Sequence, residues 1–317
     1  MISKYKIYFT IAFLFASFLS FAQPDDLKKV DYTLADKIAT EFPKKKKYKT
    51  VSDIAGPLTE NLKTEHEKFR AIFRWITENI EYNKSAANAA DADKVIRKNK
   101  AVCQGFSNLL KEMCESVKIP CEMVVGYTKT DVKDINRKLK KTDHAWNIVT
   151  LYNKKYLVDV TWATSKFNVN TRKFEKAFDE HYFLTPPEKF ILDHLPENKK
   201  DQLLEKPLSK KRFSSTPLLY ADYFHVGIGD IFPNKGKLKQ RQSEPFVFKF
   251  NCTGEFPINE ASILADNDKY FTPVKLTKSI TPGFTHEFLY TFEKEGDHDL
   301  TIFLNGKPIV EYLIKVK

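Results

Sequence analysis

Three side chains whose types can act together in catalysis occur along the chain in the order thiol, imidazole, carboxylate. Cys103 begins an amphipathic run, His144 opens an apolar segment, and Asp159 interrupts a second apolar segment. A thiol with a reference pKa of about 8.5 is mostly protonated at neutral pH, so it needs a base to become a nucleophile. An imidazole can take that proton, and a carboxylate on the second ring nitrogen fixes the tautomer. The sequence therefore predicts a catalytic triad that attacks a carbonyl group through a thiolate.

Cys103 also has a simpler interpretation, because a cysteine at the start of an apolar helical stripe is more often a small buried hydrophobic residue. Positions 103, 106, 110, 113 and 117 form such a stripe. His144 and Asp159 favour the catalytic interpretation, since ionisable groups in apolar segments break the pattern where a site is expected. The predicted helix N-terminus at Cys103 adds partial positive charge, which favours the thiolate.

The segments around these residues resemble the core motifs of the transglutaminase-like superfamily, in that family's order. The motifs are Cys103-Gln104-Gly105-Phe106, His144-Ala145-Trp146-Asn147 and Val158-Asp159-Val160-Thr161-Trp162. Residues 73–82 are similar to the helix that precedes the nucleophile, and residues 181–204 resemble the extension of the kyphoscoliosis peptidase branch. One departure is Ala101, where such proteins commonly have glycine; it affects the local turn rather than the triad.

The resemblance implies a thiol enzyme that acts on protein or peptide amides, with no cofactor and no metal. Cys103 would form a thioester, His144 would protonate the leaving amine, and Asp159 would orient His144. Whether an amine or water resolves the thioester depends on how well the cleft excludes water, and the sequence leaves this open.

Substrate contacts are predicted at Gln104, Trp75 and Trp146. The backbone N–H of Cys103 is expected to stabilise the oxyanion, and Gln104 is a candidate second donor that could equally point to solvent. Trp75 could line the channel for the acyl donor, or it could simply pack in the core.

Two other classes of function compete with a thiol enzyme. An inactive transglutaminase-fold scaffold would bind peptides or cell-envelope proteins, although a chain freed from catalysis would gain stability from an apolar residue in place of Asp159. A carbohydrate-active enzyme ranks last, because no pair of carboxylates stands out. His181 and His194 are rival bases, and we expect each to be replaceable with a loss of packing only.

The first 22 residues are predicted to be a signal peptide. Lys4 and Lys6 precede an apolar stretch over residues 7–21, and Ser20-Phe21-Ala22 has small residues where a signal peptidase cuts. Cleavage near Ala22 would give an exported protein, periplasmic or extracellular. The stretch is shorter than the roughly 18 residues of a membrane span, and no later stretch is longer, so no membrane span is expected.

Export permits disulfide bonds, which bears on the other thiols. Cys114 and Cys121 lie on either side of Lys118-Ile119-Pro120, where a helix is expected to end and a strand to begin. The two cysteines could form a disulfide, or they could be a pair of buried free thiols. Cys252 is expected in the core of a strand.

The chain of 317 residues has a formal charge of +11, from 52 Lys and Arg against 41 Asp and Glu. Lysine clusters at residues 44–47 and 138–141 could attract nucleic acid or an acidic surface, but a solvated face explains them more simply. Neither helix-turn-helix nor zinc-finger spacing occurs, and basic and aromatic residues do not interleave. We therefore expect no nucleic-acid partner. His225, His286 and His298 are scattered along the chain without the spacing of metal ligands, so we also expect no metal site.

The patterns predict an α+β fold with four parts along the chain. These are the signal peptide (1–22), an N-terminal helical arm (23–62), a transglutaminase-like domain with its extension (63–213) and an immunoglobulin-like β-sandwich (214–317). Helices are expected over 64–79 and 103–117, packed on an antiparallel sheet. In the last part, apolar residues alternate at period two, and Asn305-Gly306 predicts a tight hairpin turn.

The strands that carry His144 and Asp159 are predicted to form a hairpin about Asn153-Lys154. A two-residue turn there would pair Asp159 with Ile148. Because Ile148 is four residues from His144, the two catalytic groups would lie about 13 Å apart along the strand. A bulge, a longer loop or strong twist would have to close that gap.

Overall fold

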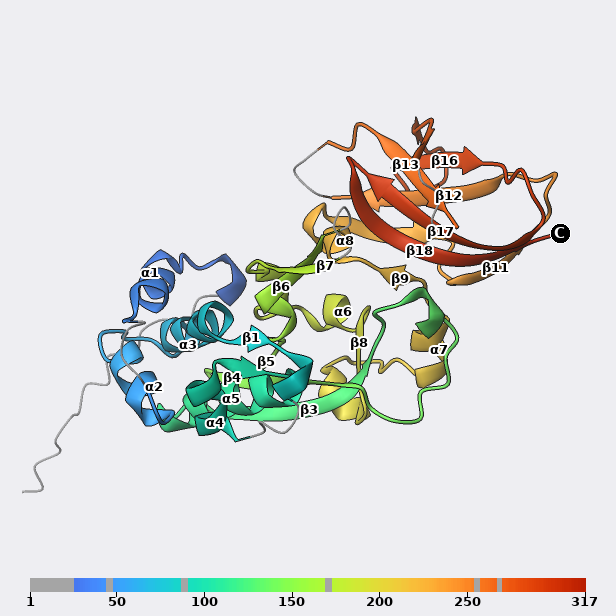
Figure 1. Cartoon of the computed structure of the whole chain (residues 1–317). Coiled ribbons are helices and arrows are strands. Elements are labelled where there is room, and N and C mark those ends of the chain that lie inside the picture. Colours follow the sequence, from blue (N-terminus) through green and yellow to red (C-terminus); the bar gives the residue numbers. More distant parts are fainter. Residues whose placement is uncertain (1–25, 44–47, 87–90, 169–172, 254–256, 267–269) are drawn as a thin grey trace, which may run out of the picture.

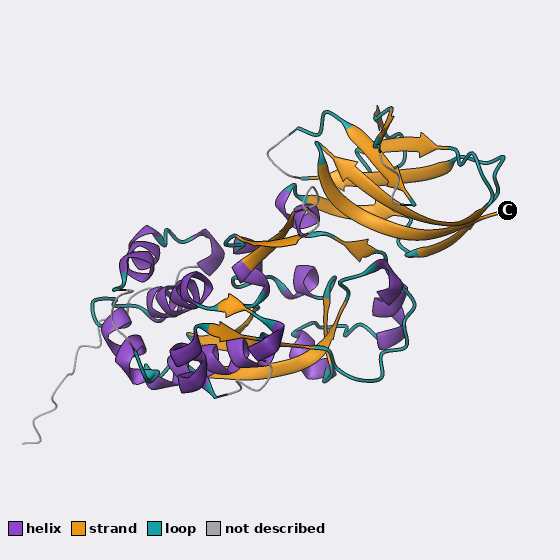
Figure 2. Cartoon of the chain, viewed as in Figure 1, coloured by secondary structure: helices purple, strands orange, loops and turns teal. Residues whose placement is uncertain are grey.

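The computed structural model describes residues 26–43, 48–86, 91–168, 173–253, 257–266 and 270–317 (Figure 1). The predicted signal peptide lies outside these residues. Helices gather in the first two thirds of the described chain, and the C-terminal third is built almost entirely of strands (Figure 2). None of the helices in the described ranges has the length and apolar character needed to cross a lipid bilayer.

The N-terminal arm is helical where it is described. It contains η1 (Leu27–Lys29), α1 (Thr33–Glu41) and α2 (Ser52–Thr59). Its apolar residues join the main hydrophobic core, and Arg70 of the next helix, itself buried, binds Asp36 of α1 through two hydrogen bonds of 2.6 and 2.8 Å. The arm is therefore packed onto the body that carries the triad.

The two helices predicted from apolar periodicity are present, as α3 (Glu65–Asn79) and α5 (Cys103–Ser116). The α3 helix begins at a capping box, in which Thr64 and Glu67 satisfy each other's backbone N–H groups. Between the two helices lie η2 (Lys84–Ala86) and α4 (Ala92–Lys98), and the short strands β1 (Glu81–Tyr82) and β2 (Lys100–Ala101) pair in parallel. That pairing fixes the segment that enters α5 at Cys103.

A four-stranded antiparallel sheet packs against α5. Its strand order is β5-β4-β3-β8, with β3 (Cys121–Thr128), β4 (His144–Leu151), β5 (Lys154–Val158) and β8 (His194–Pro196). Asn147 of β4 donates a 2.9 Å hydrogen bond to the carbonyl oxygen of Ser107 in α5. This contact ties the strand that begins with His144 to the helix that begins with Cys103.

The predicted position of the hairpin turn is wrong by one residue. Tyr152 and Asn153 form the turn, with φ of 51° and 63°, so Ile148 pairs with Leu157 and Asn147 with Val158. An aromatic residue rarely adopts positive φ, which is why the sequence favoured the Asn-Lys pair. The corrected register places Asp159 level with Trp146, two residues from His144, and removes half of the expected gap.

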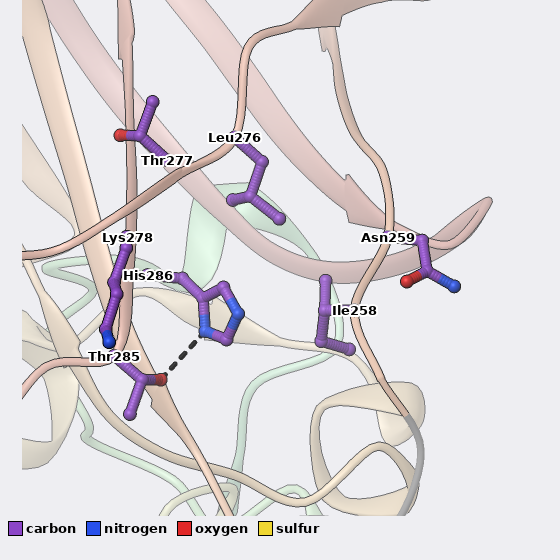
Figure 3. Close-up of a pocket in the computed structure, with 7 residues that line it drawn as sticks. All are labelled: Ile258, Asn259, Leu276, Thr277, Lys278, Thr285 and His286. Atoms are coloured by element: carbon purple, nitrogen blue, oxygen red, sulfur yellow. Dashed lines mark hydrogen bonds between the residues drawn. The ribbon is translucent and has the colours of Figure 1, made fainter.

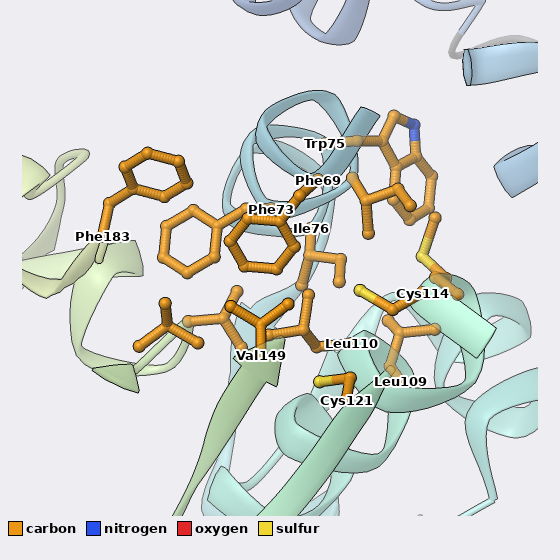
Figure 4. Close-up of a cluster of buried hydrophobic side chains, with 14 of the residues drawn as sticks. Phe69, Phe73, Trp75, Ile76, Leu109, Leu110, Cys114, Cys121, Val149 and Phe183 are labelled. Carbon is orange, nitrogen blue, oxygen red and sulfur yellow. The ribbon is translucent and has the colours of Figure 1, made fainter. Parts of the chain in front are cut away.

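The helices and the sheet share one core (Figure 4). Phe69, Phe73 and Phe183 pack together, with ring centroids 5.2 to 6.0 Å apart. Cys114 and Cys121 lie in the same core as buried free thiols that share a hydrogen bond, so of the two alternatives the structure has the free thiols.

Residues 162–225 follow β5 and contain short elements, of which β8 belongs to the first sheet and β9 pairs with β18 (Lys307–Val316) of the C-terminal region. In chain order they are η4 (Trp162–Thr164), β6 (Ser165–Asn168), β7 (Lys173–Lys176), η5 (Glu180–Tyr182), α6 (Pro187–Phe190), β8, η6 (Lys199–Gln202), α7 (Lys210–Ser215), β9 (Leu218–Leu219) and α8 (Ala221–His225). Lys129 is buried at this junction, and its ammonium group donates hydrogen bonds to the carbonyl oxygens of Phe213 and Pro217.

The C-terminal region contains two sheets that share a second hydrophobic core. One has the order β10-β12-β16-β15, with β10 (Ile228–Phe232), β12 (Phe246–Cys252), β16 (His286–Tyr290) and β15 (Thr277–Lys278). The other has the order β11-β18-β17-β13-β14, with β11 (Lys237–Gln240), β18 (Lys307–Val316), β17 (Gly296–Leu304), β13 (Ala261–Ala265) and β14 (Thr272–Val274). Asn305 and Gly306 form the predicted tight turn, both with positive φ. Cys252 ends β12 and is partly buried against this core.

Candidate active site

Cys103 is the first residue of α5 and is half-buried. The first intrahelical bonds of α5 are those from Gly105 and Phe106 to the carbonyl oxygen of Val102, at 2.8 and 3.1 Å. The N–H groups of Cys103 and Gln104 precede these bonds and point out of the helix end, where the helix dipole is positive. The sulfur therefore lies beside partial positive charge.

His144 is the first residue of β4, and its side chain contacts both other members of the predicted triad. Its Nε2 lies 2.6 Å from Asp159 Oδ2. The imidazole also forms a hydrogen bond with the Cys103 thiol, and Nδ1 is the nitrogen left for that contact. The structure thus brings Cys103, His144 and Asp159 together in the order that proton transfer requires.

The backbone around Asp159 fixes the carboxylate. At Asp159 the chain leaves β5, and the Asp159 N–H donates to the carbonyl oxygen of Tyr182 at 3.0 Å. The N–H groups of Thr161 and Trp162 donate to Asp159 Oδ1 at 2.8 and 3.0 Å. With Oδ1 held by the backbone, Oδ2 points to His144. Together with the corrected register, this departure from the strand closes the predicted gap.

Each member of the triad has a shifted pKa with an identifiable cause. Burial alone would raise the pKa of the Cys103 thiol, but the hydrogen bond and charge of His144 and the Ala145 N–H outweigh it and lower the pKa. Burial opposes the charged form of His144 as well, yet the Asp159 carboxylate raises the His144 pKa to about 10. Burial would raise the pKa of Asp159, and the two histidines that contact it lower it instead. The three shifts favour a thiolate beside an imidazolium.

A second histidine contacts the triad carboxylate. His194 Nε2 lies 3.0 Å from Asp159 Oδ2, and His194 Nδ1 lies 2.6 Å from Asp193 Oδ1. The hydroxyl group of Tyr182 donates to Asp193 Oδ2 at 3.1 Å. His194 therefore does more than pack, because its ring links two buried carboxylates; that it can be replaced without loss of activity stays a prediction. The residue types made His194 a candidate base, but they do not indicate this contact, because 35 residues separate His194 from Asp159 along the chain.

His181, the other rival base, makes different contacts. Its ring is buried and stacks on Phe224, with centroids 3.9 Å apart. Burial and the charge of Lys28 lower the His181 pKa to about 2, so this ring is neutral at ordinary pH. It packs between the extension and α8.

The side-chain nitrogens and oxygens of His144, Asp159 and His194 lie within 4.8 Å of one another, a spacing that a metal ion could also use. The two hydrogen bonds to Asp159 already account for this closeness. Within the described residues we therefore interpret the group as a proton network.

The three predicted substrate-contact residues differ in accessibility. Gln104 is exposed beside Cys103. Trp75 is buried in the main core (Figure 4). Trp146 is fully buried, with its ring centroid 5.1 Å from that of His194. The two tryptophans thus support the site from within, and their contact with a substrate stays a prediction.

Two other aromatic residues lie nearer the open side of the site. Tyr82 of β1 is 44% exposed and pairs with Ala101, two residues before Cys103, and burial and the charge of Cys103 both raise the pKa of its phenol. Trp162 is partly exposed and lies over both histidines, with centroids 5.5 Å from His144 and 4.4 Å from His194. The position of Tyr82 depends on the β1–β2 pairing, which its sequence pattern does not reveal.

A separate pocket lies in the C-terminal region (Figure 3). Its lining includes Ile258, Leu276 and His286, and the imidazole of His286 contacts the Thr285 hydroxyl group at 2.8 Å. None of the triad residues lines it. The pocket therefore belongs to the β-rich region and not to the candidate active site.

Comparison with known proteins agrees with this architecture. Residues 52–162 match the family model of the transglutaminase-like superfamily, so this part of the chain is a transglutaminase-like domain. The chain is also similar to kyphoscoliosis peptidase from Mus musculus (30% identity over 220 residues, 65% of this chain and 33% of the relative) and from Homo sapiens (32% over 208 residues, 64% and 32%). The resemblance to the superfamily and to that branch is confirmed.

The chain spans about a third of the length of these curated relatives. A solved structure described as a TGase aligns with 49% of this chain and 38% of its own, at 17% identity and a TM-score of 0.28. That global similarity is too low to support a functional comparison.

Proposed function

We propose that the protein is a thiol enzyme that acts on protein or peptide amides through a thioester on Cys103. The observation that carries the proposal is the continuous hydrogen-bonded path from the Cys103 thiol through His144 to Asp159. The kyphoscoliosis peptidases bear peptidase in their name, which agrees with an amide substrate.

In the first half-reaction, the Cys103 thiolate attacks the amide carbonyl carbon, and the carbonyl π electrons move to the oxygen. The N–H groups of Cys103 and Gln104 at the start of α5 are suited to stabilise this oxyanion. When the tetrahedral intermediate collapses, the C–N bond breaks and the leaving amine takes the proton from His144 Nδ1. A thioester and a free amine result.

In the second half-reaction, a primary amine or water attacks the thioester and gives up a proton to His144. The C–S bond then breaks, and the Cys103 thiolate re-forms beside the imidazolium. Attack by an amine gives an isopeptide crosslink, and attack by water gives hydrolysis. The exposed edge of the site at Tyr82 and Gln104 is where an acceptor could enter.

The alternative is a scaffold that binds peptides with an inactive site. A fully buried, ionised Asp159 costs free energy unless it is paired, and in a pure binding module an apolar residue would be more stable. This consideration favours the enzyme.

The test is the reactivity of the thiols in the purified protein towards iodoacetamide at pH 6. An activated Cys103 should react at least tenfold faster than Cys252, a partly buried thiol away from the triad that serves as an internal control. The substitution His144→Ala should abolish the difference. Equal, slow labelling of both thiols would favour the scaffold. Glutamine peptides incubated with and without a primary amine, followed by mass spectrometry, would then separate crosslinking from hydrolysis.

We also infer export, with cleavage near Ala22, to the periplasm or the cell exterior, where protein substrates or cell-envelope components would be the partners. Support comes from the basic start, the apolar stretch and the small residues before Gln23. The mass of the protein purified from its native cells decides this. An intact N-terminus on protein from the soluble cell interior would contradict it.

For the C-terminal region we infer an immunoglobulin-like domain. We letter the strands in chain order: β10 and β11 are the two parts A and A′ of a split first strand, β12 is B, β13 and β14 are C and C′, and β15 to β18 are D to G. The first sheet then has the order A-B-E-D and the second the order A′-G-F-C-C′, which is typical of that fold. Limited proteolysis of the full chain should release it as a stable fragment that starts near residue 214. Degradation of this region without such a fragment would argue against an autonomous domain.

A further inference from the structure

We propose that His194 is a positioning residue of this site: a buried imidazolium that holds the Asp159 carboxylate in place beside His144 and shares its negative charge. The inference rests on the proposed thiol chemistry and adds a fourth side chain to it. His194 does not contact the reacting atoms and acts through Asp159.

The protonation of His194 follows from its two partners. Nε2 faces Asp159 Oδ2 at 3.0 Å, and Nδ1 faces Asp193 Oδ1 at 2.6 Å. Ionised carboxylates only accept hydrogen bonds, so a ring that bonds to both must carry a proton on each nitrogen. Burial lowers the pKa of His194, but the two carboxylates outweigh it and raise the pKa.

The surroundings hold the ring in one orientation. His194 is 0% exposed, and its centroid lies 4.3 Å from that of Phe190 and 4.4 Å from that of Trp162. Trp146 meets it edge-on at 5.1 Å. A ring held on three sides and hydrogen-bonded at both nitrogens has little rotational freedom, so it can fix the direction of Asp159 Oδ2.

The hydrogen-bonded series from Asp159 through His194 and Asp193 ends at the neutral hydroxyl group of Tyr182. Tyr182 donates to the second oxygen of Asp193, and beyond it no further side chain bonds to this carboxylate among the described residues. The ionisable groups that face or influence the pair of His194 and Asp193 are Asp159, His144, Tyr182, the neutral His181 and the buried Lys129. From the thiolate inward, charges alternate in sign through His144, Asp159, His194 and Asp193.

This alternation has a measurable consequence. Asp159 divides its attraction between two imidazolium rings whose centroids lie 5.5 Å apart. Removal of the positive charge at residue 194 lets Asp159 stabilise protonated His144 more strongly, and it also removes one positive charge from the surroundings of the sulfur. Both effects raise the pH at which protons leave the site.

The substitution His194→Gln tests this, because glutamine retains an N–H donor for Asp159 and carries no charge. The measurement is the rate of iodoacetamide labelling at Cys103 as a function of pH in the full chain. The curve of labelling rate against pH has a lower inflection where the thiolate–imidazolium pair forms and an upper inflection where His144 loses its proton. We expect the upper inflection to rise by about one pH unit, and the lower one by less, because His194 is farther from the sulfur.

His181→Gln is the matched control, since His181 is a buried histidine of the same extension without a bond to Asp159. Its inflections should stay at the wild-type pH. The double variant Asp193→Asn with His194→Gln leaves no buried carboxylate unpaired, so it should fold even if the single variant does not, and its inflections should rise in the same direction.

A folded His194→Gln or double variant with wild-type inflections would overturn the inference and leave the thiol enzyme intact. Slow labelling of Cys103 in the wild-type protein would instead overturn the proposed function itself. A measurement on the unaltered protein is independent of folding: the ¹⁵N chemical shifts of His194 should show both ring nitrogens protonated at pH 7, and a neutral ring would refute the inference.

Discussion

Gly126 lies directly against Trp146. A Cβ atom at residue 126 would lie 2.4 Å from Cη2 of the indole and 2.3 Å from the carbonyl oxygen of Leu195. Gly126 is also the cross-strand partner of His144. The absence of a side chain here lets the tryptophan approach β3, in contact with the rings of His144 and His194.

We expect Gly126→Ala to lower the free energy of unfolding by about 1 to 3 kcal/mol, because the added methyl group must displace the indole and the backbone of β8. Labelling of Cys103 should slow by about tenfold, since a shift of His144 lengthens its contact with the sulfur. Urea denaturation and iodoacetamide kinetics measure the two effects. Gly56→Ala is the control: a Cβ there meets no atom within 4 Å, and alanine favours the helix, so stability should stay equal or rise.

Asn147 should couple stability to reactivity. Its amide group bonds to the Ser107 carbonyl oxygen and joins β4 to α5, so Asn147→Ala should cost about 1 to 3 kcal/mol and slow labelling of Cys103 severalfold. Thr150→Ala alters the opposite face of the same strand and should leave the labelling rate unchanged. Equal rates in the two variants would show that the contact has no role in aligning the thiol and the imidazole.

Arg70 should hold the N-terminal arm and the extension together. It binds both oxygens of Asp36 in α1 and both oxygens of Glu180 in η5. Lysine cannot form paired bonds, so Arg70→Lys should lower stability by about 2 kcal/mol and speed amide hydrogen exchange in α1. Arg74 is more exposed than Arg70 and pairs with Glu78 of the same helix, so Arg74→Lys should cost less than about 1 kcal/mol. Unchanged exchange in α1 would contradict this role.

The pair of His144 and Asp159 should make stability depend on pH at both ends of the range. The folded pKa of Asp159 lies below its ordinary value of 3.8, so its contribution is present above about pH 4 and is lost as the pH falls. The folded pKa of His144 is about 10, above its ordinary 6.5, so its contribution is full below pH 6.5 and is lost as the pH rises towards 10.

Urea denaturation from pH 3 to pH 10 of the wild-type protein and Asp159→Asn measures this dependence. The difference in unfolding free energy between them should be largest near neutral pH and shrink at both extremes. A constant difference would mean that the pair is not ionised in the folded state.

The sequence predicted the helices that begin near residues 64 and 103 because each combines a strong apolar periodicity with a clear start. It also predicted that Cys103, His144 and Asp159 would converge, from their types and their place in apolar segments. The hairpin register was wrong because it depends on positive φ at Tyr152, a conformation that residue type disfavours. The contact between His194 and Asp159 could not be predicted, because it depends on the three-residue pairing of β8 with β3.

The hydrogen bond from the Asp159 N–H to the Tyr182 carbonyl oxygen has a practical consequence for truncation experiments. The match to the superfamily model ends at residue 162, but a fragment cut there would lose Tyr182, Asp193 and His194. With them would go one of the four polar contacts of the Asp159 side chain and the acceptor of its backbone N–H. The smallest fragment that preserves the triad geometry therefore extends at least through Pro196, the end of β8.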